Sequence, residues 1–124
     1  MHQNMKKQRK LRNMLVDLVM RGIPEVILNG HVYKRLPGNA SFSIKGIDAN
    51  TLLIMMEEDG ICASAGSACN TNDRSISHVI KAIKVPGDYA QGTIRFSIGA
   101  DNTEKDIYKA YKSLETNVRL LRMV

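Results

Sequence analysis

Cys69 is the residue whose type and surroundings best suit covalent chemistry in this chain of 124 residues. The segment 64–74, Ser-Ala-Gly-Ser-Ala-Cys-Asn-Thr-Asn-Asp-Arg, is small and polar throughout, which predicts a flexible surface loop. A thiol in such a loop is open to solvent and to large reactants, as a nucleophile requires. Arg74 and His78 are the nearest groups in the sequence that could favour a thiolate. The residues alone leave an inert loop thiol as the alternative.

Cys62 has different neighbours. It lies between Ile61 and Ala63 in a short apolar run from Gly60 to Ala63. We expect this run to be a strand and the Cys62 side chain to be a small buried hydrophobe. Two cysteines at this spacing form neither a disulfide framework nor a four-ligand zinc site. The sequence therefore predicts free thiols and no metal site.

Arg95 is the best candidate for an anion-binding residue. From Thr93 to Gly99 the residues alternate, with apolar side chains on one face of a predicted strand and polar ones, including Arg95, on the other. An arginine fixed on a strand suits bidentate binding of a carboxylate or a phosphate. An exposed arginine without a role is the alternative. His31 and His78 have no partner that the sequence identifies, and we assign them no catalytic role.

The remaining elements follow from hydrophobic periodicity and from capping residues. They are, in chain order, a helix over 3–20 that Gly22 and Pro24 stop, strands over 26–28 and 41–45, a helix from the cap Asp48 to Glu58, the strand over 60–63, a helix over 76–83 that Pro86 and Gly87 end, the strand over 93–99, and a helix opened by Thr103 and Asp106. This order predicts a single α+β domain over residues 1–124, with a small, largely antiparallel sheet covered by helices on one face.

The predicted sheet has two unlike faces. The covered face should carry Phe42, Ile44, Ile94, Phe96 and Ile98, packed against the first and last helices. The other face should carry Ser41, Ser43, Thr93, Arg95 and Ser97. We expect the polar face to be either wet or docked on another surface.

Composition and charge argue against a nucleic-acid partner and a membrane partner. The chain has 18 Lys and Arg against 12 Asp and Glu, and five of the cations precede residue 13. Since only 5% of residues are aromatic and the cations share one helix face, we expect solvated lysines and no nucleic-acid partner. No apolar run approaches a membrane span and no apolar stretch follows the first charges, which predicts a cytoplasmic protein with no membrane partner. A homo-oligomer is compatible with these features.

Four segments carry a family resemblance. The sequence Gly-Ile-Cys-Ala-Ser-Ala-Gly-Ser-Ala-Cys at 60–69 resembles the cysteine-bearing loop of the pyridoxal-phosphate-dependent cysteine desulfurases, the NifS/IscS-like group of the class V aminotransferase superfamily. Segments 35–44, 77–83 and 93–99 resemble that family's first small-domain strand, the helix after the loop, and the arginine-bearing strand. The Ser-Ala-Gly-Ser-Ala-Cys loop and Ile-Arg-Phe-Ser-Ile-Gly, at the right separation, make the resemblance specific.

The resemblance implies roles for two residues. Cys69 would attack the sulfur of a bound cysteine and become a persulfide, and Arg95 would bind the substrate carboxylate. The family's cofactor lysine lies in a large domain in a His-Lys context, which this sequence lacks. The resemblance is therefore to the C-terminal small domain, which would bind no cofactor alone and be inactive until joined, in cis or in trans, to a large domain that binds pyridoxal phosphate. Sulfur would pass to an acceptor or iron–sulfur scaffold protein.

Two alternatives stay open. The chain could be a stand-alone persulfide carrier or interaction module that accepts sulfur on Cys69 and needs no cofactor. The second alternative is a basic nucleic-acid-binding domain, whose affinity for nucleic acid would fall steeply with salt concentration. We expect residues 66–73 to be the most mobile internal segment unless a neighbouring molecule holds them, because they contain no large apolar side chain to anchor them.

Overall fold

The computed structural model describes residues 2–29, 38–65 and 87–123. The described elements, in chain order, are α1 (His2–Gly22), β1 (Val26–Leu28), β2 (Asn39–Ile44), α2 (Ala49–Glu58), β3 (Ser64–Ala65), α4 (Gly87–Ala90), β4 (Thr93–Ser97) and α5 (Glu104–Arg122). The predicted helix over 76–83 and the expected mobility of 66–73 lie outside the described residues.

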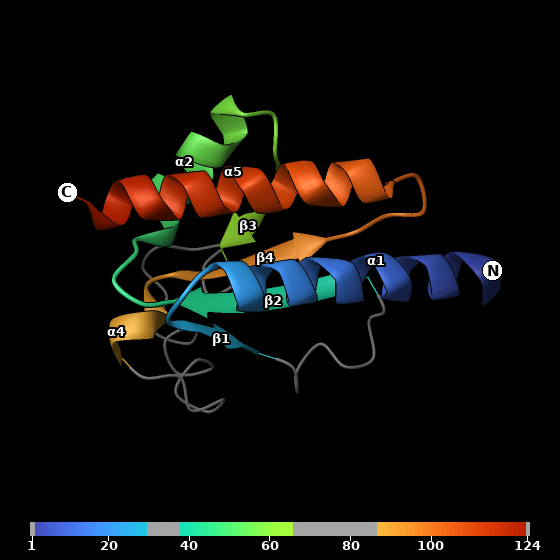
Figure 1. Cartoon of the computed structure of the whole chain (residues 1–124), viewed down its shortest axis with the longest axis horizontal. Coiled ribbons are helices and arrows are strands. Elements are labelled where there is room, and N and C mark those ends of the chain that lie inside the picture. The colour runs from blue at the N-terminus through green and yellow to red at the C-terminus, as the bar shows by residue number, and fades with distance from the viewer. Residues whose placement is uncertain (1, 30–37, 66–86, 124) are drawn as a thin grey trace.

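The sheet has four strands in the order β1-β2-β4-β3, and every neighbouring pair is antiparallel. The helices α1 and α5 pack against each other, and Figure 1 shows them running alongside the sheet. The predicted α+β architecture with a small antiparallel sheet is confirmed. The short helix α4 was not predicted, because Gly87 had been interpreted as the end of a preceding helix.

The apolar face of the sheet forms the core with these helices. Phe42 and Phe96 meet edge to face, with ring centroids 6.1 Å apart. Every residue predicted for the covered face is buried, and Leu15, Val19, Leu114 and Val118 from α1 and α5 belong to the same cluster. Strand alternation and helical periodicity therefore identify one common core, as predicted.

The predicted helix caps are confirmed. The Asp48 carboxylate accepts from the Thr51 backbone N–H at 3.2 Å, at the start of α2. At the start of α5, the Thr103 hydroxyl and the Asp106 carboxylate form a reciprocal capping box. These side chains satisfy backbone N–H groups that a helix leaves without intrahelical partners.

The predicted strand over 60–63 is wrong. Gly60 has a φ of 82°, and the backbone N–H groups of Gly60 and Ile61 donate to Glu57 and Met56, which closes α2. A residue in the left-handed region after a helix is typical of a C-terminal cap. Because the cap uses these backbone groups, the strand begins only at Ser64.

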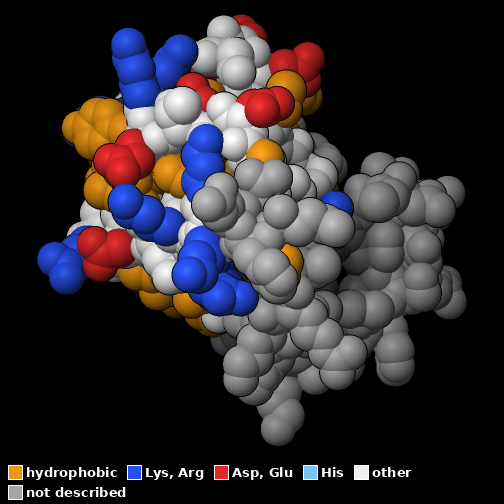
Figure 2. All heavy atoms as spheres, turned by 90° about the vertical axis from the view of Figure 1, so that its right-hand side faces the viewer, with side chains coloured by type: hydrophobic (Ala, Val, Ile, Leu, Met, Phe, Trp, Pro, Cys, Tyr) orange, Lys and Arg blue, Asp and Glu red, His pale blue; other side chains and the backbone are white. Residues whose placement is uncertain are grey.

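The first twelve residues carry the expected solvated cations. Lys6, Lys7, Arg9 and Lys10 are exposed, whereas Leu11 is buried. Figure 2 shows Lys and Arg side chains spread over this end of the molecule with Asp and Glu between them. Lys10 forms an ion pair with Glu104 at 3.6 Å, and Lys7 donates to the Ala100 carbonyl at 2.9 Å.

Arg122 connects the end of α5 to two distant turns. Its guanidinium donates to the carbonyls of Pro24 at 2.8 Å, Glu25 at 3.3 Å and Lys45 at 3.1 Å. Glu25 is a non-glycine residue with a φ of 57°, a conformation with a steric cost in most side chains. The guanidinium therefore holds a strained turn between α1 and β1 against the end of β2.

We expect Arg122→Ala to lower the free energy of unfolding by about 1 to 2 kcal/mol, because three carbonyls lose a charged donor at a partly exposed site. Urea denaturation at neutral pH measures this change. The matched control is Arg119→Ala, which removes an exposed ion pair with Glu115 and should change stability by less than about 0.5 kcal/mol. Equal effects of the two substitutions would contradict the role given to Arg122.

Asp59 makes stability depend on pH. Hydrogen bonds from Ser113 at 2.7 Å and Asn117 at 3.0 Å lower the pKa of Asp59 below its usual value of 3.8. A carboxyl whose pKa is lower in the folded state stabilises the fold above its unfolded pKa, and this contribution is lost as the pH falls through the folded pKa.

We expect Asp59→Asn to destabilise the protein at pH 7, with the difference from the unsubstituted chain shrinking below about pH 4. Urea denaturation across pH measures it, with Glu57→Gln on the same helix as the control; a difference that keeps its full pH 7 size as the pH falls to about 2 would contradict the linkage.

Candidate functional site

Arg95 lies in the middle of the polar face of the sheet. Its strand, β4, lies between β2 and β3, and the register puts Ser41 directly opposite Arg95 on one side and Ser64 on the other. Directly opposite residues of antiparallel strands point to the same face. Arg95 is half-buried and its Nε atom is buried. The guanidinium is therefore placed on a rigid element between two hydroxyls.

A buried network of side-chain hydrogen bonds extends from the Ser41 side of this face. The Asn29 amide donates to Ser43 Oγ at 2.8 Å and to Ser41 Oγ at 3.3 Å. Ser43 Oγ lies 2.7 Å from Thr93 Oγ1, which donates to the Ala90 carbonyl at 2.9 Å. All four polar side chains are buried. The polar face was expected to be either wet or docked on another surface. In the structure Ser41, Ser43 and Thr93 are buried, whereas Ser97 on the same face of β4 is exposed.

The strand neighbours of Arg95 favour an anion. The polar side chains that the described strands and Asn29 give to this face are hydroxyls and amides: Asn29, Asn39, Ser41, Ser43, Ser64, Thr93 and Ser97. No carboxylate belongs to this set. A guanidinium among such groups can bind a carboxylate or phosphate through parallel N–H donors.

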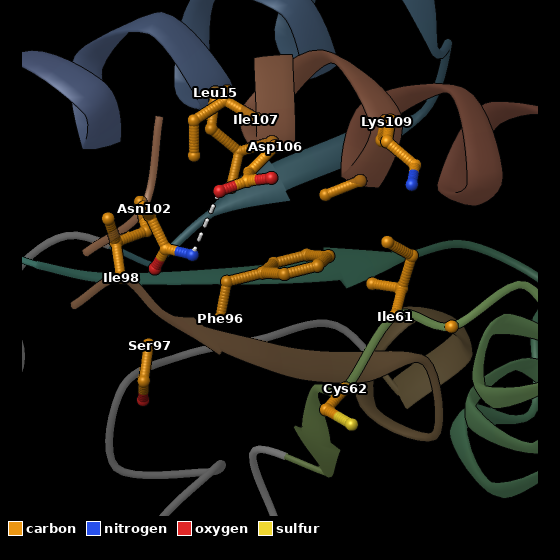
Figure 3. A pocket seen from close by; sticks show the side chains of 12 residues that line it. Leu15, Ile61, Cys62, Phe96, Ser97, Ile98, Asn102, Asp106, Ile107 and Lys109 are labelled. Carbon is orange, nitrogen blue, oxygen red and sulfur yellow. Dashed lines mark hydrogen bonds between the residues drawn. The ribbon is translucent and has the colours of Figure 1, made fainter. Parts of the chain in front are cut away.

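The prediction that Cys62 is buried is wrong, because the side chain is exposed. The cap of α2 keeps residues 60–63 out of the sheet, so Cys62 is not enclosed between strands. It borders a cavity of about 380 Å³ between β4 and α5, whose walls include Phe96, Ile107 and Ala110. Figure 3 shows this cavity and the opposite directions of Phe96 and Ser97 on β4.

Asp106 also lines the cavity but is committed to the helix cap. Its carboxylate accepts from the Thr103 backbone N–H at 2.9 Å and from the Asn102 amide at 3.4 Å, the second of which Figure 3 marks. These hydrogen bonds lower the pKa of Asp106, the Thr103 backbone contributing most. An ionised carboxylate held by two donors is a structural group and a poor proton acceptor at neutral pH.

The described residues offer no lysine to pyridoxal phosphate beside Arg95. Their lysines belong to α1, to α5 and to the turn after β2, and none is part of a strand. The turn residue, Lys45, is hydrogen-bonded to Glu25 at 3.1 Å with Asp88 at 3.8 Å, which raises the pKa of Lys45. Only the unprotonated amine attacks an aldehyde, so the raised pKa makes Lys45 a poorer nucleophile than an ordinary lysine. The described part of the chain therefore does not fit this cofactor by itself.

Several predicted residues lie outside the described ranges. Cys69, Arg74, His31 and His78 are among them, so the role given to Cys69 stays a prediction. Within the described ranges, no three His, Cys, Asp or Glu side chains group as a metal ion would require. No described helix has both the length and the apolar character of a membrane span.

Sequence reasoning missed two residues of this site. Asn29 directly follows the predicted strand over 26–28 and was given no role; its contacts with Ser41 and Ser43 join residues at least 12 positions apart. Ser64 was assigned to the loop, although it pairs with Arg95. Only the β1-β2 and β3-β4 pairings bring these side chains to Arg95, and no local pattern encodes those pairings.

Solved structures share this fold. A NifS-like protein from Rickettsia africae superposes with a TM-score of 0.77 at 27% identity, over 94% of this chain and 29% of its own. A second NifS-like protein gives a TM-score of 0.74 at 28% identity, over 94% of this chain and 28% of its own.

Curated relatives agree with the structural neighbours. The cysteine desulfurase IscS of Clostridium botulinum is 44% identical over 103 residues, which is 82% of this chain and 26% of the relative. That of Dictyoglomus turgidum is 33% identical over 124 residues, the whole of this chain and 32% of the relative. The chain thus spans about a quarter to a third of the length of these relatives, and the NifS/IscS-like resemblance is confirmed. The model of the aminotransferase class-V family matches residues 1–109, and the chain belongs to this family.

Proposed function

We propose that this chain is the part of a cysteine desulfurase that supplies a sulfur-accepting thiol, Cys69, and a substrate-binding arginine, Arg95. The relatives that it matches are cysteine desulfurases, but the chain spans only part of each. Under this proposal the chain is the small C-terminal domain of the enzyme. The groups that bind pyridoxal phosphate come from a large domain, which is joined to this chain in cis or in trans.

The pairing of Ser64 with Arg95 is the observation that carries the proposal. Directly paired residues have Cα atoms about 5 Å apart. Cys69 follows Ser64 by five positions, and five residues of extended chain span at most about 18 Å. The covalent chain therefore ties the thiol to the neighbourhood of Arg95, while the intervening small residues leave its path unconstrained by bulky side chains.

Arg95 would bind the carboxylate of L-cysteine. Its position on the middle of β4, between Ser41 and Ser64, fixes the base of the side chain. A fixed guanidinium orients a substrate and reduces the entropy lost when the reacting atoms meet. The substrate sulfur would then be presented to a thiol arriving on the loop.

The sulfur transfer balances without an external oxidant. L-cysteine and the Cys69 thiol give L-alanine and the Cys69 persulfide: the carbon–sulfur bond of the substrate breaks, a sulfur–sulfur bond forms, and the hydrogen count is conserved. Thiol exchange then moves the terminal sulfur to an acceptor protein such as an iron–sulfur scaffold. Free thiols of this kind persist in a reducing compartment, so we place the protein in the cytoplasm.

Pyridoxal phosphate would be held by the large domain and would serve there as the electron sink. The lysines of the described residues do not fit the cofactor, which agrees with a chain that binds none alone. The chain is then inactive by itself. No step assigned here to Cys69 or Arg95 requires a cofactor contact from the described residues.

We expect Cys69→Ser to abolish persulfide formation, because a hydroxyl cannot accept and release a sulfur atom. The test uses a chimera in which this chain replaces the matching segment of the Clostridium botulinum desulfurase, loaded with pyridoxal phosphate. Alanine release and the mass of the persulfide-bearing peptide are measured. Cys62→Ser is the matched control and should leave both unchanged.

A persulfide on Cys62, or full turnover of Cys69→Ser to a protein acceptor, would contradict the proposal. The persulfide-carrier alternative predicts a different pattern. The isolated chain would accept sulfur on Cys69 from the intact Clostridium enzyme, whereas the chimera would release no alanine.

For Arg95→Ala in the same chimera, we expect KM for L-cysteine to rise by about 30- to 150-fold, the equivalent of a lost charged hydrogen-bond pair. The reason is the loss of the carboxylate contact. Arg9→Ala, which removes an exposed arginine of α1, is the control and should leave KM unchanged. An unchanged KM with Arg95→Ala would remove Arg95 from the substrate site.

A further inference from the structure

We propose that the edge of β4 beyond β3 binds an extended peptide segment of a partner protein, and that the cavity between β4 and α5 takes one apolar side chain of that segment. The inference uses neither the role of Cys69 nor that of Arg95, so it stands apart from the proposed function. It depends on the backbone of Ser97, on the cavity walls and on the charge of Lys109.

The backbone of β4 alternates in the side to which it directs its hydrogen-bonding groups. In an antiparallel sheet a residue points its N–H and C=O to one neighbouring strand, and the next residue points them to the other. Ile98, directly after β4, donates its N–H to the Gly38 carbonyl at 2.7 Å, and Gly92, directly before β4, accepts from the Ile44 N–H at 3.0 Å. Both bonds lie on the β2 side. Ser97 therefore directs its N–H and C=O to the side on which β3 lies.

The strand β3 is too short to cover Ser97. Its two residues pair with Arg95 and Ile94, and the same register would place Cys62 opposite Ser97. That pair is not formed, because the cap of α2 holds the chain before Cys62 away from the sheet. Within the described ranges, the Ser97 N–H and C=O have no backbone partner. These two groups form an open sheet edge of the kind to which an extended peptide adds as a strand.

The cavity lies where the next side chain of an added strand would point. Cys62 and Ser97, both exposed, border this cavity of about 380 Å³, and its inner walls include the buried Phe96, Ile107 and Ala110. Successive side chains of a strand point to opposite faces, so a residue next to the one paired with Ser97 would point to the face that α5 covers. A volume of this size with apolar walls is in the range of ligand pockets, and it accommodates a leucine side chain.

Lys109 adds a charge preference to the cavity. It projects from α5, is exposed and lines the cavity, and Figure 3 shows it on the helix above Ile61. It forms no ion pair with a described residue, unlike Lys112 and Arg119 farther along α5. The carboxylate that shares the cavity, Asp106, is held by the helix cap. A partner segment that carries an acidic residue beside its apolar one therefore fits this surface best.

The test uses two synthetic peptides, acetyl-Thr-Leu-Thr-Glu-Thr-amide and the isomer with Leu and Glu exchanged. In each, the central Thr would pair with Ser97 and the two flanking side chains would share the covered face. We expect one of the two to bind the ¹⁵N-labelled chain, because antiparallel pairing admits one chain direction. The Ser97 amide should shift downfield and exchange more slowly with solvent as it gains an acceptor.

Changes in the peptide separate backbone pairing from apolar binding. N-methylation of the central Thr removes one backbone donor and should weaken binding by about 3- to 10-fold. Replacement of Leu by Ala should weaken it by about 10-fold or more, since most of the buried apolar area is lost. Neither change alters the protein, so the fold is the same in every titration.

Changes in the protein provide a matched pair. Ser97→Pro removes the edge N–H without touching the bonds to β2, and it should weaken binding by about 3- to 10-fold. Ser97→Ala keeps the backbone donor and should leave the affinity unchanged. Lys109→Gln should weaken binding by about 2- to 5-fold and reduce its dependence on sodium chloride concentration.

Four results would overturn the inference. They are the failure of both peptides to bind, equal affinity of the N-methylated peptide, equal affinity of acetyl-leucine amide, which cannot add as a strand, and a Ser97 amide that shifts with protein concentration alone. The last result would make a second copy of the chain the occupant of this edge. None of them bears on Cys69 or Arg95, so the proposed function is tested separately.

Discussion

The antiparallel register between β2 and β4 is the constraint on which both the core and the candidate site depend. Phe42 opposes Ile94 on the helix-covered face, and Ser41 opposes Arg95 on the other. Since successive side chains of a strand alternate between faces, a slip by one residue would expose Phe96 and drive Arg95 against α1 and α5. The burial of apolar surface therefore also fixes the position of the guanidinium.

The two faces stabilise that register by different means. The apolar face is held by packing of Phe42, Ile94 and Phe96 against the helices. On the polar face, Asn29, Ser43 and Thr93 join the end of β1 to the neighbouring strands β2 and β4 through short hydrogen bonds. Buried polar groups are costly unless their partners are present, so this network tolerates only the native register. The strand that carries Arg95 is therefore held on both of its faces.

The sequence was informative where the signal was local. Alternation located Phe42, Phe96 and Arg95 on their correct faces, and Asp48 and Thr103 were identified as caps because capping depends on residues three positions apart. The prediction for Cys62 was wrong because its apolar neighbours indicate a strand. In the structure Gly60 has a positive φ, and the backbone of Gly60 and Ile61 caps α2, so the chain around Cys62 does not join the sheet. The positions of Asn29 and Ser64 at the site were not predicted, because their partners are distant in the chain. A contact between one amide and two hydroxyls produces no periodic pattern in the sequence.

The difference between the two thiols follows from where α2 ends. The cap at Gly60 and Ile61 delays the return of the chain to the sheet until Ser64, so β3 is an edge strand of two residues. Cys62, before that strand, borders a cavity whose walls include Ile107 and Ala110 of α5. Ser64, the first residue of β3, lies on the same face of the sheet as Arg95. The strand β3 thus pairs with the segment of β4 that holds Arg95, whereas Cys62 lies between the α2 cap and β3 and is exposed. The proposed function assigns the sulfur-accepting role to Cys69, which follows β3 in the chain seven positions after Cys62.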